Sequence, residues 1–217
     1  METILGAACI MAIAALLWAY RSRRSRGGPA WPEQVPGDDF RTVTRRIQEI
    51  LEPIGWPVGS EKSGRAHSLS VGGRAAFFIE VAYDVPTTNM FAIIGGFRAA
   101  NQEQRAFVVL GNGAPEFIAA PKGVFGKPSA PIVLAEDRAF AKAFWVEGSD
   151  ERAVRRYLGQ ELRALLLEQE GPFRLHGRAA GVALVREGRM TTPSQAQVTK
   201  TLERLALAVD AAERGAR

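Results

Sequence analysis

The chain has 217 residues, of which 47% are hydrophobic and 24% are charged, as in an ordinary globular protein that is long enough to bury a core. Its single cysteine, Cys9, excludes an intramolecular disulfide and a cluster of thiolate metal ligands. Basic residues exceed acidic ones by 28 to 23, but without Glu2 and the four arginines between 21 and 26 the numbers are 24 and 22. The excess is therefore local, and we expect no nucleic-acid partner.

The excess of basic residues lies just after an uncharged stretch of seventeen residues, Ile4 to Tyr20, which is followed directly by RSRRSR. A helix needs about 20 apolar residues, with a range of ~17–25, to cross the ~30 Å hydrocarbon core of a bilayer. Aromatic rings suit the headgroup level and arginines can snorkel to it. The sequence thus predicts a transmembrane anchor with a basic collar over residues 1–26. Its anchor and collar residues are Ile4, Trp18, Tyr20, Arg21, Arg23, Arg24 and Arg26.

The order of charges also predicts an orientation. Arginines resist translocation, so the collar should stay in the cytoplasm together with residues 27–217, on the inner face of a bacterial cell membrane. A cleaved signal peptide would carry positive charge before the apolar run, whereas Met1–Thr3 has none. A buried core helix fits poorly, because the run is apolar all round. Anionic lipid, which attracts each basic residue near the surface by ~1 kcal/mol, would explain the collar.

Prolines and glycines over residues 27–37 predict a semi-extended linker, and residues 38–217 are expected to form one soluble domain. Asp38 or Asp39 can cap a helix that runs to about Glu52. The apolar stripe of this helix consists of Phe40, Val43, Ile47, Ile50 and Leu51. Residues 55–73 are rich in turn-forming residues and show little periodicity.

Alternating hydrophobicity then predicts an antiparallel meander of short strands. The expected strands cover residues 74–85, 90–98, 105–110, 116–120 and 141–147. Ser149 is expected to cap a helix whose buried stripe is Val154, Leu158, Leu162, Leu165 and Leu166. A hairpin over residues 173–187 follows, with its turn at 179–181.

Thr192, Pro193 and Gln195 resemble a capping box for a last helix that runs to about Ala212. Its core-facing residues would be Val198, Leu202, Leu205 and Val209. The element order predicts an α+β fold: a transmembrane helix, then an antiparallel sheet with helices packed on one face. From residue 141 onward the order resembles a split βαβ unit.

No motif in the sequence predicts catalysis. The stretch from Gly55 to Ser63 lacks the lysine position of a phosphate-binding loop. His67 and His176 lack ligand spacing and are expected at the surface. Glu80 and Asp84 lie about 13 Å apart along a strand, beyond the roughly 5–9.5 Å of glycosidase carboxylates, so a solvated face is expected. We predict no catalytic, cofactor-binding or metal-binding residue, and a non-enzyme in preference to an enzyme.

Arg174, His176 and Arg178 alternate on one expected strand and would form a small basic face. Such a face could meet acidic lipid headgroups or a protein partner. Alternation of this kind is also typical of the wet side of a sheet.

The stretch FAKAFWVEGSDERAVR from Phe140 to Arg155, with GVALV at 181–185 and the closing helix after Pro193, resembles a group of uncharacterised bacterial single-pass membrane proteins. The resemblance covers about residues 90–212. It implies a strand-to-helix turn followed by a hairpin and a final helix, and it implies no activity or functional residue.

These features together predict a non-enzymatic, membrane-tethered interaction or scaffold domain. Its expected partners are the lipid bilayer and a protein at the membrane. The alternative is a domain that binds lipid or another apolar molecule between the sheet and the last helix. Its pocket would be lined by Phe77, Phe78, Phe91, Phe97 and Phe107. A hydrolase is the third hypothesis.

Overall fold

The computed structural model describes residues 40–54, 56, 63–84, 101–123, 126–187 and 193–216. The chain divides into two units, Met1–Glu33 and Gln34–Arg217, and the described residues belong to the second. The predicted anchor, collar and linker lie outside the described residues, as does the expected strand over 90–98. Among the helices that the structure describes, none has the length and apolar character needed to span a membrane.

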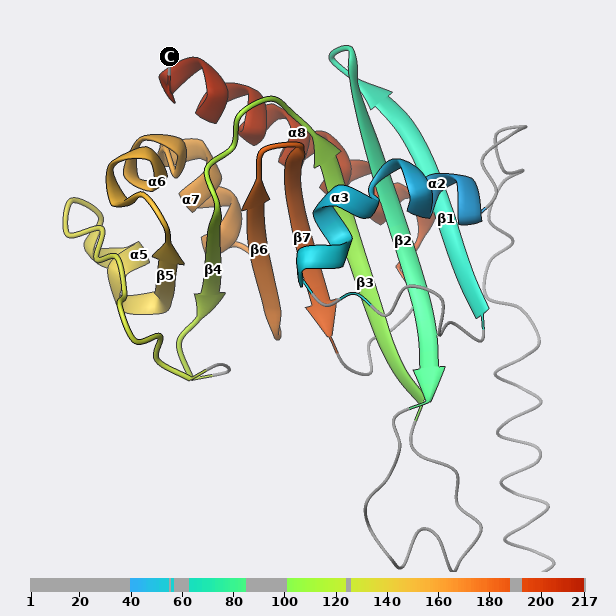
Figure 1. Ribbon diagram of the computed structural model, residues 1–217, viewed down its shortest axis with the longest axis horizontal. Coiled ribbons are helices and arrows are strands. Elements are labelled where there is room, and N and C mark those ends of the chain that lie inside the picture. The colour runs from blue at the N-terminus through green and yellow to red at the C-terminus, as the bar shows by residue number, and fades with distance from the viewer. Residues whose placement is uncertain are drawn as a thin grey trace, which may run out of the picture. The chain divides into compact units, whose positions relative to one another are not determined.

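The domain is built on a seven-stranded sheet in the order β1-β2-β3-β7-β6-β4-β5 (Figure 1). Every neighbouring pair of strands is antiparallel. The strands are β1 (Ser63–Val71), β2 (Arg74–Asp84), β3 (Asn101–Leu110), β4 (Phe117–Pro121), β5 (Phe144–Gly148), β6 (Phe173–Arg178) and β7 (Gly181–Glu187). The predicted α+β class with an antiparallel sheet is confirmed.

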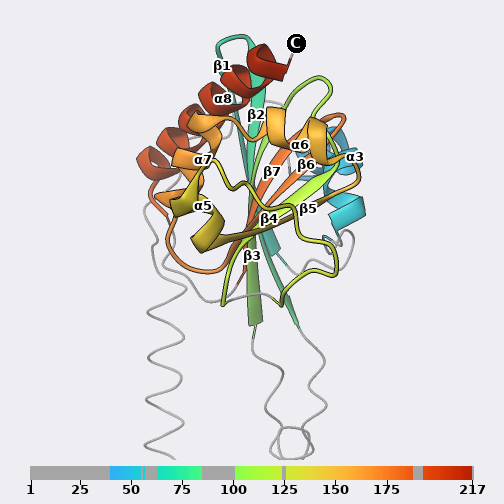
Figure 2. The same ribbon diagram turned by 90° about the vertical axis from the view of Figure 1, so that its left-hand side faces the viewer.

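Helices cover both faces of this sheet, so the prediction of helices on one face is wrong (Figure 2). The first face carries α2 (Phe40–Arg46), α3 (Gln48–Leu51) and the 3-10 turn η1 (Glu52–Ile54). The second carries α5 (Arg138–Ala143), α6 (Glu151–Tyr157), α7 (Gln160–Leu167) and α8 (Gln195–Ala216). We call these the α2/α3 face and the α8 face. The cause lies in the strands, because both Phe77 and its neighbour Phe78 are fully buried, on opposite sides of β2.

The α2/α3 face holds an apolar core over strands β2, β3 and β7. Its members are Val43, Ile47, Ile50, Leu51, Trp56, Phe77, Ile79, Val81, Ala106, Val108, Ala183 and Val185. The predicted stripe of the first helix is thus buried as expected at its four members whose side chains are described. Arg46 adds a cation–π contact, with its guanidinium carbon 4.7 Å from the centre of the Phe77 ring.

The long helix α8 crosses the other face and contacts β1, β2 and β3 as well as α6 and α7. The four residues predicted to face the core, Val198, Leu202, Leu205 and Val209, are all fully buried. The capping box lies two residues later than predicted. Ser194 Oγ accepts from the Gln197 amide at 3.3 Å, and Gln197 Oε1 accepts from the Ser194 amide at 2.8 Å.

Several local elements differ from the prediction, three of them in type or place. Strand β1 occupies the passage expected to be turn-rich, and it joins β2 through Gly72 and Gly73, whose φ angles of 58° and 82° suit the tight turn of a hairpin. Residues 138–143 form α5 rather than the start of a strand, because the Asp137 side chain caps the helix by accepting from the Phe140 amide. The helix expected after Ser149 begins instead after the cap Asp150 and breaks between α6 and α7 at Gly159.

Candidate binding groove

Strands β4, β5 and β6 carry no helix on their α2/α3 face in the part of the chain that the structure describes. The strand register sets the side chains of this area in rows. Trp145 of β5 lies opposite Ala120 of β4, and the next row contains Glu147, Ile118 and His176. Since side chains alternate along a strand, Arg174 and Arg178 emerge on the same face as His176.

Two adjoining hollows lie over this area. The first has a volume of about 230 Å³ and the second about 400 Å³. The first is lined by Ile118, Ala120, Gly126, Pro128, Trp145, Glu147 and Arg174. The second is lined by Glu116, Phe117, Ile118, Ser129, Ala130, Glu147, Gly148, Ser149 and Arg178. Because Ile118 and Glu147 line both, we treat the hollows as one site and call it the β4–β6 groove.

One wall of the groove belongs to the segment between β4 and α5, which is held beside β5. The Ile132 amide donates to the Val146 carbonyl at 2.7 Å, so the outer edge of β5 is occupied at this point. Arg155 fixes the same segment from the other side by donating to the Val133 carbonyl at 2.7 Å. A ligand would therefore approach the face of the sheet rather than extend it at its edge.

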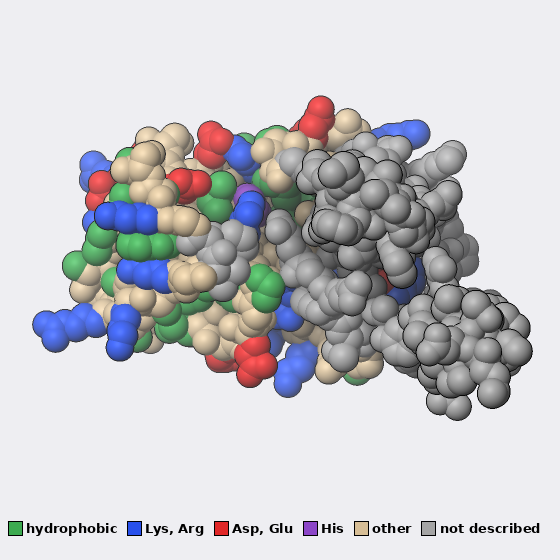
Figure 3. Space-filling model, turned by 90° about the horizontal axis from the view of Figure 1, so that it is seen from below, with side chains coloured by type: hydrophobic (Ala, Val, Ile, Leu, Met, Phe, Trp, Pro, Cys, Tyr) green, Lys and Arg blue, Asp and Glu red, His purple; other side chains and the backbone are tan. Residues whose placement is uncertain are grey.

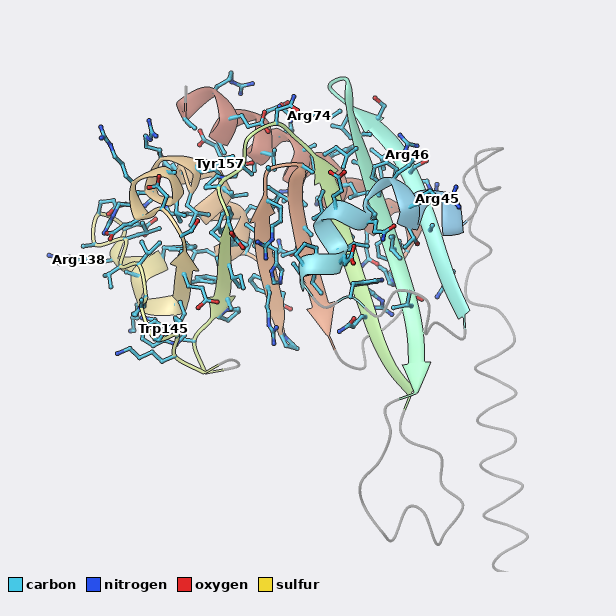
Figure 4. The ribbon with its side chains drawn as sticks, in the orientation of Figure 1. Arg45, Arg46, Arg74, Arg138, Trp145 and Tyr157 are labelled. Atoms are coloured by element: carbon cyan, nitrogen blue, oxygen red, sulfur yellow. The ribbon has the colours of Figure 1, made fainter. Side chains whose placement is uncertain are left out.

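Trp145 lies near the start of β5 (Figure 4), and the side chains of two lysines lie over its ring. The ammonium nitrogen of Lys122 is 3.9 Å from the ring centre, and that of Lys127 is 5.7 Å away. Lys122 also donates to the Ala141 carbonyl at 2.5 Å. Basic side chains interspersed with hydrophobic ones gather at the end of the domain that carries α5 and β5 (Figure 3).

The cations around the groove have contacts within the chain, whereas one carboxylate has no hydrogen bond or ion pair with any described residue. Arg178 pairs with Glu116 at the rim, and Arg174 is also engaged. Among the described residues no hydrogen bond or ion pair reaches Glu147, although its side chain is partly buried and lines both hollows. Lys122 and Lys127 also have no carboxylate partner among the described residues, so the groove contains charges of both signs that are not held in ion pairs.

His176 lies beneath this site and is only 4% exposed, so its predicted surface position is wrong. Burial, followed by the positive charge of Arg174, lowers the pKa of His176 from 6.5 to about 4. The imidazole is neutral at pH 7 and does not neutralise Glu147. The basic face predicted on β6 is reduced to its two arginines.

The buried imidazole predicts a specific loss of stability in acid. The pKa of His176 is lower in the folded chain than in the unfolded chain, so its contribution is complete above pH 6.5 and is lost as the pH falls towards 4. The shift corresponds to about 3 kcal/mol in total. Urea unfolding of wild type and His176→Gln at several pH values measures it. The difference in unfolding free energy between the two proteins should change across this window, and parallel curves would contradict the assignment.

A second polar cluster lies on the α8 face. Glu80 accepts from Arg65 and from Arg105, each at 2.5 Å, and Arg105 is only 3% exposed. Arg186 continues the row on β7, where burial, and then the charge of Arg105, lowers its pKa. The prediction that Glu80 belongs to a solvated strand face is wrong, because α8 and the neighbouring strands enclose that face.

A third cluster joins the turn after β3 to the C-terminal half of α8. Arg74 donates to both oxygens of Glu213, at 2.6 and 3.1 Å, and also pairs with Asp210. Glu213 accepts in addition from the Asn112 amide at 3.0 Å. The hydroxyl of Tyr157 is buried without a hydrogen-bond partner in the described structure, and burial raises its pKa, with a further increase from the charge of Glu213. Arg74 and Tyr157 both lie at the upper end of the sheet in Figure 4.

The residues that the sequence predicted for the anchor and for an apolar pocket either lie outside the described residues or are buried in packing. The predicted anchor and collar lie outside the described residues. Phe77, Phe78 and Phe107 are buried in packing, and the rings of Phe78 and Phe107 lie 5.0 Å apart, while Phe91 and Phe97 are outside the described residues. Among the described residues, no group of histidine, cysteine or carboxylate side chains could hold a metal ion.

The groove residues Trp145 and Glu147 were missed as a site. The sequence pattern that could have indicated the site is an aromatic residue and a carboxylate on the same face of one short strand. Ordinary half-exposed strands share this pattern. No protein-family model, curated protein or solved structure matches this chain. The class of protein therefore rests on the geometry of the described residues, and the resemblance to bacterial single-pass membrane proteins stays a prediction.

Proposed function

We propose that this protein is a non-enzymatic interaction domain, tethered to the cytoplasmic face of a cell membrane by the apolar segment at residues 4–20, and that a partner protein binds in the β4–β6 groove. The observation that carries the proposal is the groove itself. It is a hollow stretch of sheet face with an apolar floor and a partly buried carboxylate, and no helix covers it in the described structure.

Tethering would serve such a domain because it confines the groove to a thin layer at the bilayer. The effective concentration towards partners in the same layer rises without any new contact. The polar clusters outside the groove support a binding role rather than catalysis. The carboxylates of Glu80 and Glu213 are both held in ion pairs with arginines that fix the sheet and α8.

Site-specific photo-crosslinking tests the proposal. A photoreactive amino acid replaces Ser129, in the wall of the groove, or Leu207, which is 62% exposed on α8 and lies on the opposite face. The full chain is irradiated in its native membranes. We expect a defined crosslinked protein from position 129 and none from position 207, and loss of membrane fractionation when residues 1–26 are deleted.

Crosslinking from the control position 207 would contradict the proposal. The same crosslinked protein from both positions would indicate contact without use of the groove. Products confined to position 207 would place the interaction on the α8 face. Either result would overturn the proposed role of the β4–β6 groove.

A further inference from the structure

The end of the domain that carries α5 and β5 concentrates lysine. Three of the chain's five lysines, Lys122, Lys127 and Lys142, lie between the end of β4 and the start of β5. Arg138 on α5 adds a fourth cation, and Figure 4 shows it at the same end of the domain as Trp145. We call the surface formed by these five residues the α5–β5 surface.

Contacts within the chain join these residues into one continuous surface. Lys122 donates to the Ala141 carbonyl on α5. Its ammonium group and that of Lys127 lie over the Trp145 ring. Val133 is 53% exposed and lines a small hollow together with Lys122 and Trp145. Cations, an indole ring and an exposed apolar side chain therefore adjoin one another.

The positive charges of the α5–β5 surface have no counter-charge among the described residues. No described carboxylate forms an ion pair with any of its cations, Lys122, Lys127, Arg138 and Lys142. An aromatic face attracts a cation but carries no net charge, so the two lysines over Trp145 remain fully positive. Lys127, Arg138 and Lys142 are also exposed, so a partner can reach them.

The acidic residues nearby do not cancel this charge. Glu136 pairs with Arg155 at 3.3 Å and with Arg163 at 3.5 Å, on the side of α6 and α7. Asp137 pairs with Arg163 at 3.7 Å and caps α5. Glu147 lies further along β5 and offsets one positive charge at most. The α5–β5 surface therefore keeps an excess of positive charge.

A bilayer with anionic lipids fits this surface better than a single small anion. The hollow beside Lys122 has a volume of only about 10 Å³, and the larger hollow next to Trp145 contains Glu147, which would repel an anion. A lipid surface instead presents many anionic headgroups in one layer. It attracts every basic residue that lies close to it, and tryptophan suits the headgroup level.

We propose that the α5–β5 surface docks on the anionic lipid of the membrane that holds the anchor, with Trp145 and Val133 at the headgroup level and the four cations against lipid phosphates. This inference rests on the tether in the proposed function and adds a second contact with the bilayer. A tethered domain is always close to the lipid, so even weak docking is effective. The second hollow of the β4–β6 groove lies at the other end of β5, beside Gly148, and stays open to a partner protein.

Fluorescence quenching by spin-labelled lipid tests the inference on the full chain. Cys9→Ser removes the one cysteine, and a bimane label is then attached through Ala139→Cys on α5 or Leu207→Cys on α8, both at exposed positions. The protein is inserted into nanodiscs of phosphatidylcholine, with or without phosphatidylglycerol, that contain doxyl-labelled lipid. We expect quenching at position 139 in the discs with phosphatidylglycerol and its loss at about 0.5 M sodium chloride, because salt screens exposed charges. Position 207 should stay unquenched.

A pair of matched variants locates the effect. Lys127→Gln with Lys142→Gln removes two charges from the α5–β5 surface, whereas Lys200→Gln with Arg214→Gln removes two from α8. All four side chains are exposed, so both variants should fold. The ratio of docked to undocked protein should fall by about tenfold or more in the first variant and remain unchanged in the second.

Contrary outcomes separate this inference from the proposed function. Equal quenching with and without phosphatidylglycerol, or equal effects of the two variants, would overturn docking through this surface, while a crosslink at position 129 would leave the groove as a partner site. No quenching, together with binding of a fluorescein-labelled hexaglutamate peptide that Lys127 and Lys142 support, would assign the surface to an acidic protein segment instead. A chain that does not co-purify with the discs would overturn the tether and this inference together.

Discussion

Replacement of Glu80 by glutamine is expected to lower the free energy of unfolding by about 3 kcal/mol or more. Glu80 is the carboxylate that receives both Arg65 and Arg105, and the Arg105 side chain is almost completely buried. The substitution leaves that guanidinium without its counter-charge and next to Arg186 in the same row. Urea unfolding followed by circular dichroism measures the change, with an unaltered dependence on denaturant expected.

Arg65→Gln is the control for this prediction. It removes one partner of the same carboxylate, but the Arg65 side chain is 41% exposed. Solvent screening should therefore limit the loss to about 1 kcal/mol or less. Equal effects of the two substitutions would show that burial does not determine the strength of the cluster. The double variant Glu80→Leu with Arg105→Met should recover much of the loss, because it removes both buried charges together.

The elements that sequence predicted correctly are those whose pattern is local. The apolar stripe of α8 and the alternation of β2 each depend on the spacing of a few neighbouring residues, and both were confirmed. Strand β1 was missed because His67 and its serine neighbours interrupt the alternation. Its place in the sheet depends on pairing with β2, and the Gly72-Gly73 turn was the available sign of that pairing.

Coverage of both sheet faces could not be predicted, because the two faces are distinguished only by which residues meet across strands far apart in sequence. The α2–α3 segment, residues 40–51, is about 18 Å long as helix, whereas seven strands extend about 29 Å across. One face is therefore only partly covered by this segment. The part of this face that the segment does not cover belongs to β4, β5 and β6, which the strand order places side by side.

The groove follows from that partial coverage rather than from any motif. Glu147 alternates with apolar residues in β5 like any residue on a wet strand face. Its distinctive property is the absence of a partner among the described residues, and this depends on the positions of Arg174 and Arg178 on a strand some thirty residues later in the chain. Composition and periodicity contain no information on such a pairing.

Replacement of Glu213 by glutamine is expected to detach the C-terminal turns of α8 and to lower the free energy of unfolding by about 3 kcal/mol. Glu213 is only 6% exposed, and its two oxygens accept from Arg74 and from the Asn112 amide. Loss of its charge leaves the guanidinium of Arg74 with the carboxylate of Asp210 and the carbonyl of Leu110 among its described partners. Hydrogen exchange should increase in the last turns of α8 and remain slow around the buried Leu202.

Two further measurements distinguish a specific role of the contact between Arg74 and Glu213 from a general loss of stability. Asp210 is the more exposed of the two carboxylates that pair with Arg74, since its side chain is 23% exposed. Asp210→Asn should therefore lower the free energy of unfolding by about 1 kcal/mol or less. The charge of Glu213 also raises the pKa of Tyr157, so spectrophotometric titration should show a lower tyrosine pKa in Glu213→Gln than in wild type. An unchanged unfolding free energy, or hydrogen exchange that increases equally along α8, would show that the contact between Arg74 and Glu213 does not hold the helix to the sheet.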